Sequence, residues 1–267
     1  SVFVSYTVAY ACIDYSLVVF DIRVKTSPQV LSVAETDNKV VDVHVVGNYA
    51  YLANDEGGLT IIDVYWPDYA YEVGNLDTDG FAYGIYATNN KVYLADATGG
   101  LKIISVANPE APVLLGEYDE YALDVFVDGD YAYLAALNHG LYIIDISDPS
   151  NPVYTSNYMG DPGNEITGVF YNGSLLYTSC GEAGIKAFNV SNPILPTLVG
   201  SMDTPGYATE IQTNGNYAYV SDKQEGIRII DISDPTSLTE INAIESPGSA
   251  EHIFYAGLYV YTANNQS

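Results

Sequence analysis

A short apolar motif recurs six times along the 267-residue chain, and its copies begin 40 to 44 residues apart. The motif reads LTIIDV in its second copy and LYIIDI in its fourth, and a run such as YAYLA precedes it. Both runs are rich in Val, Ile and Tyr, which favours β-strands over helices. The copies begin at Leu17, Leu59, Leu101, Leu141, Ile185 and Ile227. A period of this length is typical of folds built from repeated supersecondary units.

The segments between the strands repeat as well. Pairs such as Gly47-Asn48 and Asn172-Gly173 lie between the first and second strands, as tight hairpins require. The third strand follows a glycine at positions 58, 100, 140, 184 and 226, which indicates a positive φ angle there. Asn/Asp-Pro pairs such as Asp148-Pro149 follow the third strand and predict a turn. We expect the Asp or Asn that closes this strand to cap the turn by accepting backbone N–H groups, at Asp21, Asp63, Asp145, Asn189 and Asp231.

Four antiparallel strands in about 42 residues match one blade of a β-propeller. We therefore predict an all-β chain that forms a single β-propeller domain over residues 1–267. A seventh repeat begins at Glu251 and stops at Ser267, before its third strand. Seven blades, the last incomplete in this chain, are favoured over six blades with a surplus tail. The repeats lie near residues 1–40, 41–82, 83–122, 123–166, 167–208, 209–250 and 251–267.

Two segments, GLYIIDISDPSNPV (140–153) and GIRIIDISDP (226–235), resemble the LVIVD-repeat proteins. The resemblance extends over essentially the whole chain and implies a β-propeller of bacterial and archaeal surface or secreted proteins. It implies no single activity, because the motif describes a blade and a fold does not determine a function. Two copies depart from the pattern after the third strand, with RVKTSP (23–28) in the first and VYWPDY (64–69) in the second.

The charge of the chain excludes two classes of partner. Asp and Glu number 34 and Lys and Arg number 8, so the formal net charge is −26. Nucleic-acid binding needs clustered Lys and Arg to neutralise phosphates, and an anionic membrane surface attracts the same residues. The sequence also lacks a run of about 20 apolar residues that would insert into a bilayer. We therefore expect neither nucleic acid nor direct membrane insertion.

The two cysteines and one asparagine invite covalent chemistry. Cys12 and Cys180 share one register position, at the end of the second strand, in repeats one and five. Because those blades would lie far apart and a disulfide needs Cα atoms within about 7 Å, we expect no bond between them. Asn172 is a candidate glycosylation site, since its Asn-Gly-Ser sequon lies in an expected hairpin turn.

One register position in the first strand of each blade carries polar residues: Asp42, Asp124, Glu210 and His252, with Gly84 and Gly168 between them. The first strand of a blade is innermost, so these four side chains could form a ring around the central channel. Several carboxylate oxygens suit a hard cation such as Ca²⁺, which makes the four residues a candidate metal site. The alternative is a hydrated channel with separately hydrogen-bonded carboxylates. His44, two residues after Asp42, aligns with aromatic residues and is expected to pack.

The loops that lead from one blade to the next are acidic. We expect them to surround the mouth of the channel and to form the interaction face. Their candidate residues are Asp77, Asp79, Asp119, Glu120, Asp161, Asp203 and Glu245.

Three functions from different classes fit these patterns. The first is a non-enzymatic module for protein interaction or self-assembly, located outside the cell or on its surface, because Tyr suits adaptable contacts. The second is a glycan- or cation-binding propeller that uses the acidic channel mouth. The third, a hydrolase or lyase at the channel mouth, lacks a recognisable nucleophile–base arrangement in the sequence. We expect no cofactor, with Ca²⁺ as the candidate ion.

Overall fold

A computed structural model describes residues 1–159 and 165–265 of the chain. It comprises two compact units, residues 1–125 with 147–152 and residues 126–146 with 153–267. Within the described residues, no helix is long and apolar enough to cross a bilayer. The prediction of a single domain stays a prediction.

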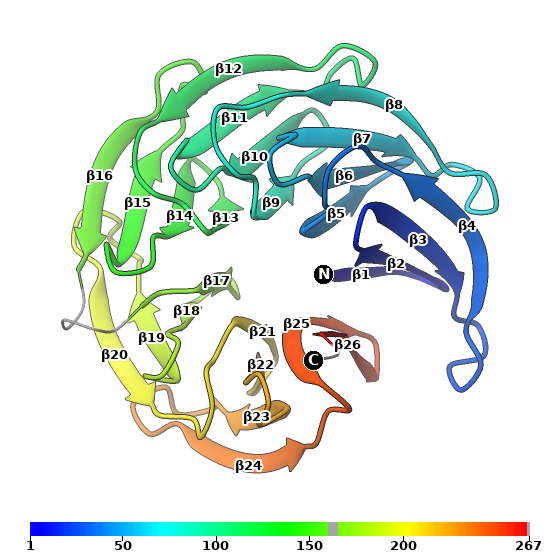
Figure 1. Ribbon diagram of the computed structural model, residues 1–267. Coiled ribbons are helices and arrows are strands. Elements are labelled where there is room, and N and C mark those ends of the chain that lie inside the picture. The colour runs from blue at the N-terminus through cyan, green and yellow to red at the C-terminus, as the bar shows by residue number, and fades with distance from the viewer. Residues whose placement is uncertain (160–164, 266–267) are drawn as a thin grey trace. The chain divides into compact units, whose positions relative to one another are not determined.

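The first unit consists of four-stranded antiparallel sheets in chain order, which we call blades 1 to 3 (Figure 1). Blade 1 contains β1 (Val2–Ser5), β2 (Val8–Ile13), β3 (Ser16–Asp21) and β4 (Gln29–Glu35). Blade 2 contains β5 (Asp42–Val46), β6 (Tyr49–Ala53), β7 (Leu59–Asp63) and β8 (Tyr71–Leu76). Blade 3 contains β9 (Gly84–Ala87), β10 (Lys91–Ala95), β11 (Leu101–Ser105) and β12 (Val113–Tyr118).

The second unit continues the series with blades 4 to 7, although β13 begins with two residues of the first unit. Blade 4 contains β13 (Asp124–Asp128), β14 (Tyr131–Ala135), β15 (Leu141–Asp145) and β16 (Val153–Tyr158). Blade 5 contains β17 (Gly168–Tyr171), β18 (Leu176–Ser179), β19 (Ile185–Asn189) and β20 (Thr197–Met202). Blade 6 contains β21 (Glu210–Asn214), β22 (Tyr217–Ser221), β23 (Ile227–Asp231) and β24 (Thr239–Ile244). Blade 7 has two strands, β25 (Ser249–Ala256) and β26 (Tyr259–Asn265).

These blades confirm the predicted fold class, a β-propeller of four-stranded antiparallel blades with an incomplete seventh. The six-blade alternative also fits, because six blades are complete. We call the strands of each blade A to D in chain order, so that β5 is strand A and β8 is strand D of blade 2.

The core lies on strands B and C. Four of the five residues of β6, and four of the five of β7, are buried. Their side chains alternate between two clusters, one shared by blades 1 and 2 and the other by blades 2 and 3. Because both faces of the sheet are covered, the sequence reads as a nearly continuous apolar run. Blades are therefore stabilised mainly by their neighbours in the chain.

The loop between strands B and C has the backbone that its glycines predicted. Gly58, Gly100, Gly140, Gly184 and Gly226 have φ angles of 67°, 77°, 91°, 69° and 77°. A Cβ at Gly140 would also overlap the carbonyl oxygen of Tyr158 on strand D. The prediction of a positive φ angle at this position is confirmed.

The turn between strands C and D is capped as the sequence predicted. Asp63 Oδ1 accepts the N–H of Tyr65 at 2.8 Å, and Asp231 Oδ1 accepts that of Ser233 at 2.9 Å. Asn189 does the same for Ser191 at 2.9 Å. The residue that closes strand C is therefore part of a turn in blades 2, 5 and 6.

Two contacts recur where one blade meets the next within a unit. The B–C loop forms an isolated antiparallel bridge to the residue two positions before strand A of the following blade, as in Gly181–Ala208. Strand D places a small residue beneath a proline carbonyl in the C–D turn of the following blade. Gly200 lies beneath Pro235, and Ser156 donates its hydroxyl to Pro193 at 2.5 Å.

Candidate functional site

The acidic position of strand A joins neighbouring blades in the first unit. Asp42 Oδ1 accepts the N–H of Val43 at 2.8 Å, and its Oδ2 accepts the N–H of Ile85, on strand A of the next blade, at 3.1 Å. Asp124 Oδ1 accepts the N–H of Val125 at 2.8 Å. A Cβ at Gly84 would lie 2.9 Å from that same oxygen, so glycine leaves room for the carboxylate.

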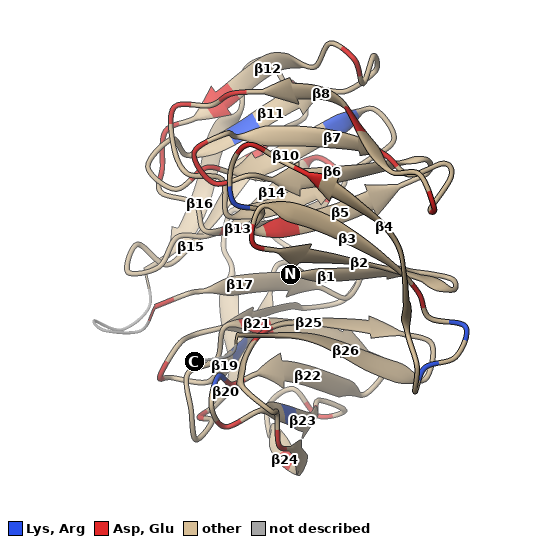
Figure 2. Ribbon diagram, turned by 45° about the vertical axis from the view of Figure 1, so that its right-hand side comes forward, with Lys and Arg blue, Asp and Glu red and all other residues tan. Residues whose placement is uncertain are grey.

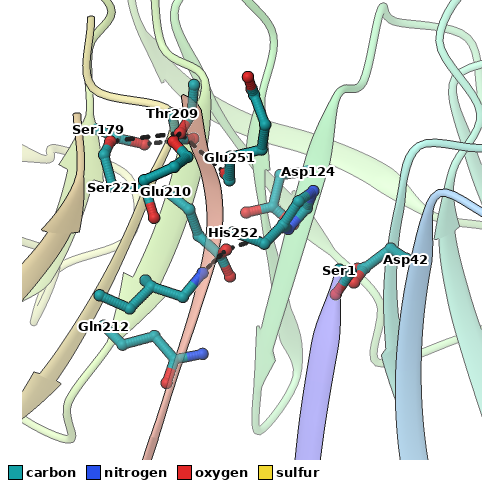
Figure 3. Close-up of polar contacts among 12 residues, drawn as sticks. Ser1, Asp42, Asp124, Ser179, Thr209, Glu210, Gln212, Ser221, Glu251 and His252 are labelled. Carbon is teal, nitrogen blue, oxygen red and sulfur yellow. Dashed lines mark hydrogen bonds and ion pairs between the residues drawn. The ribbon is translucent and has the colours of Figure 1, made fainter. Parts of the chain in front are cut away.

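Glu210 and His252 occupy the same position in the second unit and lie side by side (Figure 3). Glu210 Oε2 accepts the N–H of Ile253, on strand A of blade 7, at 2.7 Å. Nδ1 of His252 lies 3.1 Å from the same oxygen. Burial raises the pKa of the Glu210 carboxyl to about 7, although the Ile253 N–H favours the charged form. Glu210 therefore exchanges its proton near neutral pH.

Hydrogen bonding accounts for the geometry of this position. Asp42 and Glu210 each accept a backbone N–H from the following blade, which is the hydrogen-bonded alternative to a metal ring. Among the described residues, no group of three or more His, Cys, Asp or Glu side chains could hold a metal ion. Asp42 and Asp124 belong to one unit and Glu210 and His252 to the other. The four-residue ring stays a prediction, and only the Glu210–His252 pair is brought together.

Threonines just before strand A add a second link between blades in the second unit. Thr167 donates its hydroxyl to the Ala208 carbonyl at 2.8 Å. Thr209 donates its hydroxyl to the Glu251 carbonyl at 2.8 Å (Figure 3). Each threonine thus contacts the blade that follows its own. These polar contacts hold the inner strands in register, since each connects residues about one repeat apart.

The acidic loops between blades are exposed where the structure describes them. Asp77, Asp79 and Asp119 in the first unit, and Asp203 and Glu245 in the second, lie at the surface, whereas Glu120 is half-buried. Asp161 lies outside the described residues. Acidic residues outnumber basic ones on the ribbons of both units (Figure 2). The loops can contribute to a negatively charged interaction face, whose role stays a prediction.

Two of these loops are each held by a buried carboxylate, and the sequence did not reveal this contact. Asp96 Oδ1 accepts the hydroxyl of Thr78 at 2.7 Å, and its Oδ2 accepts the N–H of Gly80 at 3.0 Å. Asp222 accepts the corresponding groups of Thr204 and Gly206 at 2.7 and 3.0 Å. We call this arrangement the loop clamp. Its signal in the sequence was the Asp-Thr-x-Gly of the loop together with Asp at the end of strand B.

The other singled-out residues have structural surroundings. His44 packs between Phe3 and Tyr86, with ring centroids 5.1 and 5.0 Å away, and burial lowers the pKa of its imidazole to about 4. Its prediction as a packing residue is confirmed. Cys12 and Cys180 are both free thiols. Asn172 is exposed and its Oδ1 accepts the N–H groups of Ser174 and Leu175, so its glycosylation stays a prediction.

An exposed aromatic cluster occupies the C–D turn of blade 2, where the sequence departs from its repeat. Trp66, the only Trp of the chain, is 64% exposed. It forms an edge contact with Tyr65, with ring centroids 4.9 Å apart. Tyr69 and Tyr71 form a second pair at 5.6 Å. We call these four residues the aromatic cluster.

The outermost strand of every complete blade exposes apolar side chains. Each strand D pairs with strand C on one edge, and within the described residues no strand pairs with its other edge. The six D strands contain no Lys, Arg or Pro. Exposed apolar residues on these strands include Val30, Tyr71, Val113, Val153, Leu198 and Ile241.

A family model described as LVIVD repeat matches residues 38–78, 79–120, 121–160 and 205–245. The four matches cover more than half of the chain. No curated protein matches the sequence.

Solved structures with a similar fold include two chains from Bacteroides species and one designed protein. A candidate 6-phosphogluconolactonase from Bacteroides uniformis is 14% identical, with a TM-score of 0.81 over 96% of this chain and 85% of that one. Another from Bacteroides fragilis is 15% identical, with a TM-score of 0.80 over 93% and 84%. The computationally designed protein Ika8 is 12% identical, with a TM-score of 0.74 over 98% and 79%. At these identities the likeness shows the fold alone.

Proposed function

Because this chain belongs to the LVIVD-repeat family and folds as a β-propeller, we propose that it is a non-enzymatic assembly module located on the cell surface or outside the cell. One observation carries the proposal: the six D strands combine exposed apolar side chains, the absence of Lys, Arg and Pro, and an edge with which no strand of residues 1–159 and 165–265 pairs. The partner is a second copy of the same chain.

An unprotected edge strand is a template for pairing with another strand. Native proteins usually block such edges with Lys, Pro, a bulge or a covering segment. Here the D strands carry bulges but no basic residue. In blade 2, for example, the register of β8 shifts opposite Ile61 and Ile62 of β7. The remaining protection is the net charge of −26, which repels a second copy over long distances. Assembly is therefore controlled by ionic strength, because salt screens that repulsion.

A lactonase function receives little support from the charges of this chain. A phosphorylated lactone is an anion and needs cationic groups at its site. The chain has eight Lys and Arg residues, and Lys102, Lys186 and Arg228 are buried within blades. The non-enzymatic proposal follows from this scarcity, together with the packing and hydrogen-bonding roles found for the candidate site residues.

Assembly is tested by sedimentation velocity of the full chain over a range of salt. We expect a monomer at low salt and a concentration-dependent assembly at about 1 M NaCl, where the screening length falls to about 3 Å. Calcium chloride at equal ionic strength should promote assembly further if the exposed loop carboxylates bind the ion. The double variant Val113→Lys/Ile241→Lys should assemble less than the unmodified chain at each salt concentration, because it places Lys on two of the six exposed D strands.

The matched control is Tyr6→Lys/Leu258→Lys. Both residues are over 90% exposed, lie in A–B hairpin turns and give the same change of charge. This control should assemble like the unmodified chain. A chain that stays monomeric at high salt, or a control that fails to assemble as well, contradicts the proposal.

A second candidate function, binding of a neutral glycan, is favoured by the aromatic cluster. Trp66 occupies the register position of Asp148 in blade 4 and Asp234 in blade 6. Each of these two Asp side chains caps its turn by accepting a backbone N–H at 3.0 Å. The exchange gives up a hydrogen bond and exposes an indole, which costs stability and suits a contact with a ligand. A neutral sugar ring can stack on the aromatic faces without electrostatic repulsion.

Glycan binding is measured through the fluorescence of Trp66, which reports on the cluster alone because the chain has no other Trp. A soluble neutral polysaccharide such as laminarin should shift the emission to shorter wavelength and protect it from acrylamide quenching. In gels that contain the polysaccharide, the chain should be retarded, Tyr69→Ala should abolish the retardation, and Tyr6→Ala should keep it. An unchanged emission across several neutral polysaccharides would exclude this function.

A further inference from the structure

Blade 5 contains a buried lysine for which the described residues offer no counter-charge. Lys186 is the second residue of β19, which is strand C of this blade, and it is 5% exposed. Its Nζ is buried and has no hydrogen-bond partner among residues 1–159 and 165–265. Burying an ammonium group without a partner is costly, so the position calls for a negative charge.

The equivalent cations of blades 3 and 6 are paired with acids of their own blade. Nζ of Lys102 lies 2.6 Å from Oε2 of Glu117, on strand D of blade 3. Arg228 lies 2.9 to 3.7 Å from three acids of blade 6, which are Asp222, Glu225 and Glu240. A cation at the second position of strand C is therefore compensated by carboxylates in both of these blades.

Blade 5 keeps the cation and has none of these acids. The repeat register places Cys180, Ala183, Leu198 and Ser201 where the other two blades have Asp222, Glu225, Glu240 and Glu117. Burial raises the pKa of the Cys180 thiol, so the thiol does not supply a negative charge at neutral pH. Cys180, Ala183 and Ser201 are also shorter than the acids at the equivalent positions.

A buried hydroxyl lies in the same row as the lysine. Thr178 of β18 is directly opposite Lys186 in the antiparallel ladder, and opposed residues project from the same face of a sheet. Thr178 is fully buried, and its hydroxyl lies 3.1 Å from Sγ of Cys180. The equivalent residues of blades 2, 3, 4 and 6 are apolar: Leu52, Leu94, Leu134 and Val220. Among these blades, blade 5 thus adds a hydroxyl beside the unpaired ammonium.

The face that carries these groups packs against blade 4. Alternate residues of a strand share a face, so Lys186 lies on the same face as Phe188. Phe188 and Cys180 belong to an apolar cluster that includes Tyr133 and Ile143 of blade 4. Attraction between opposite charges is stronger in such an apolar interface than in water. One ammonium group there matches one negative charge.

We propose that blade 5 binds a small monovalent anion, such as chloride, between Nζ of Lys186 and the hydroxyl of Thr178. The ion takes the place of the carboxylate that Asp222 provides in blade 6, and it stabilises the contact of blade 5 with blade 4. An ion that enters an apolar interface must lose its water, which favours chloride or bromide over the strongly hydrated fluoride.

The site is tested by thermal unfolding of the full chain while sodium gluconate is replaced by sodium chloride at constant ionic strength. Chloride should raise the Tm by roughly 5–10 °C at a hundredfold excess over its Kd, and fluoride should raise it much less. Constant ionic strength keeps this effect apart from salt-controlled assembly. Crystals grown in sodium bromide should show an anomalous scattering peak in contact with Nζ of Lys186.

Two variants remove the need for an ion in opposite ways. Cys180→Asp supplies the carboxylate that blade 6 has, and Lys186→Met removes the charge while nearly keeping the length of the side chain. Both variants should unfold at the same temperature in chloride and in gluconate. The matched control is Lys39→Met, which removes an exposed lysine and should keep the full response to chloride.

Three results would overturn the proposal. One is a Tm of the unmodified chain that is equal in chloride and gluconate. Another is a response to chloride that persists in Lys186→Met. The third concerns Asp161, which lies outside the described residues: a lower Tm of Asp161→Asn, together with no response to chloride in the unmodified chain, would identify a carboxylate of the chain as the counter-charge.

Discussion

Replacing Asp222 by alanine is expected to lower the free energy of unfolding by about 3–5 kcal/mol, because it leaves a buried cation without its fully buried carboxylate partner. Asp222 is fully buried, and its carboxylate accepts three groups: the two of the loop clamp and the Nε–H of Arg228. Its Oδ2 lies 3.2 Å from Nε of Arg228, a residue that is 7% exposed. Arg228 keeps Glu225 at 2.9 Å, but that acid is half exposed and compensates less.

The change is measured by thermal and urea unfolding, and the Tm should fall by roughly 10 °C for a chain of this size. The matched control is Asp203→Ala, which removes an exposed acid from the loop that Asp222 holds. This control should change the free energy of unfolding by less than about 0.5 kcal/mol. If the two variants lose similar amounts of unfolding free energy, the loop clamp makes no specific contribution to stability.

Replacing Gly200 by alanine is expected to cost about 3 kcal/mol, although alanine adds only one methyl group. The new Cβ would overlap the Pro235 carbonyl oxygen, which belongs to the backbone of the next blade. Backbone cannot rotate away as a side chain can, so the two blades must separate locally. The loss of packing then spreads to the apolar cluster that blades 5 and 6 share.

Ser201→Ala, at the neighbouring exposed position of β20, is the control for Gly200→Ala and should leave the Tm within about 1 °C. Hydrogen exchange locates the effect, because amides of β20 and of the turn around Pro235 should exchange faster in Gly200→Ala. Unchanged stability would mean that the spacing of the blades adapts to a Cβ. Blade 4 does accommodate a Cβ at this position, because the hydroxyl of Ser156 donates to the Pro193 carbonyl.

The elements of each blade could be predicted from the sequence because their causes are local. The positive φ angle of Gly140 follows from its place in a short loop, and the cap at Asp231 joins residues two positions apart. Strands B and C could be recognised as nearly continuous apolar runs rich in Val, Ile and Tyr, since both of their faces are buried. Four strands per repeat then left few architectures to consider.

The roles of the polar residues could not be predicted in the same way. The register placed Asp42 and Glu210 at one height of strand A and suggested a ring, but each carboxylate accepts an N–H from the following blade. The aligned position alone does not distinguish a metal ligand from such an acceptor. Trp66 was recognised as a departure from the repeat, and its exposure became known only from the structure.

The repeat, the strands, the turns and the charge follow from the sequence alone, because each depends on neighbours a few residues apart or on composition. The atoms that meet between blades became known from the folded structure: the carboxylate of Asp42 with Ile85, and Gly200 with Pro235. These partners are about one repeat apart, and their contact depends on how two sheets pack. A difference of one methyl group decides whether that packing is allowed, which no single stretch of sequence records.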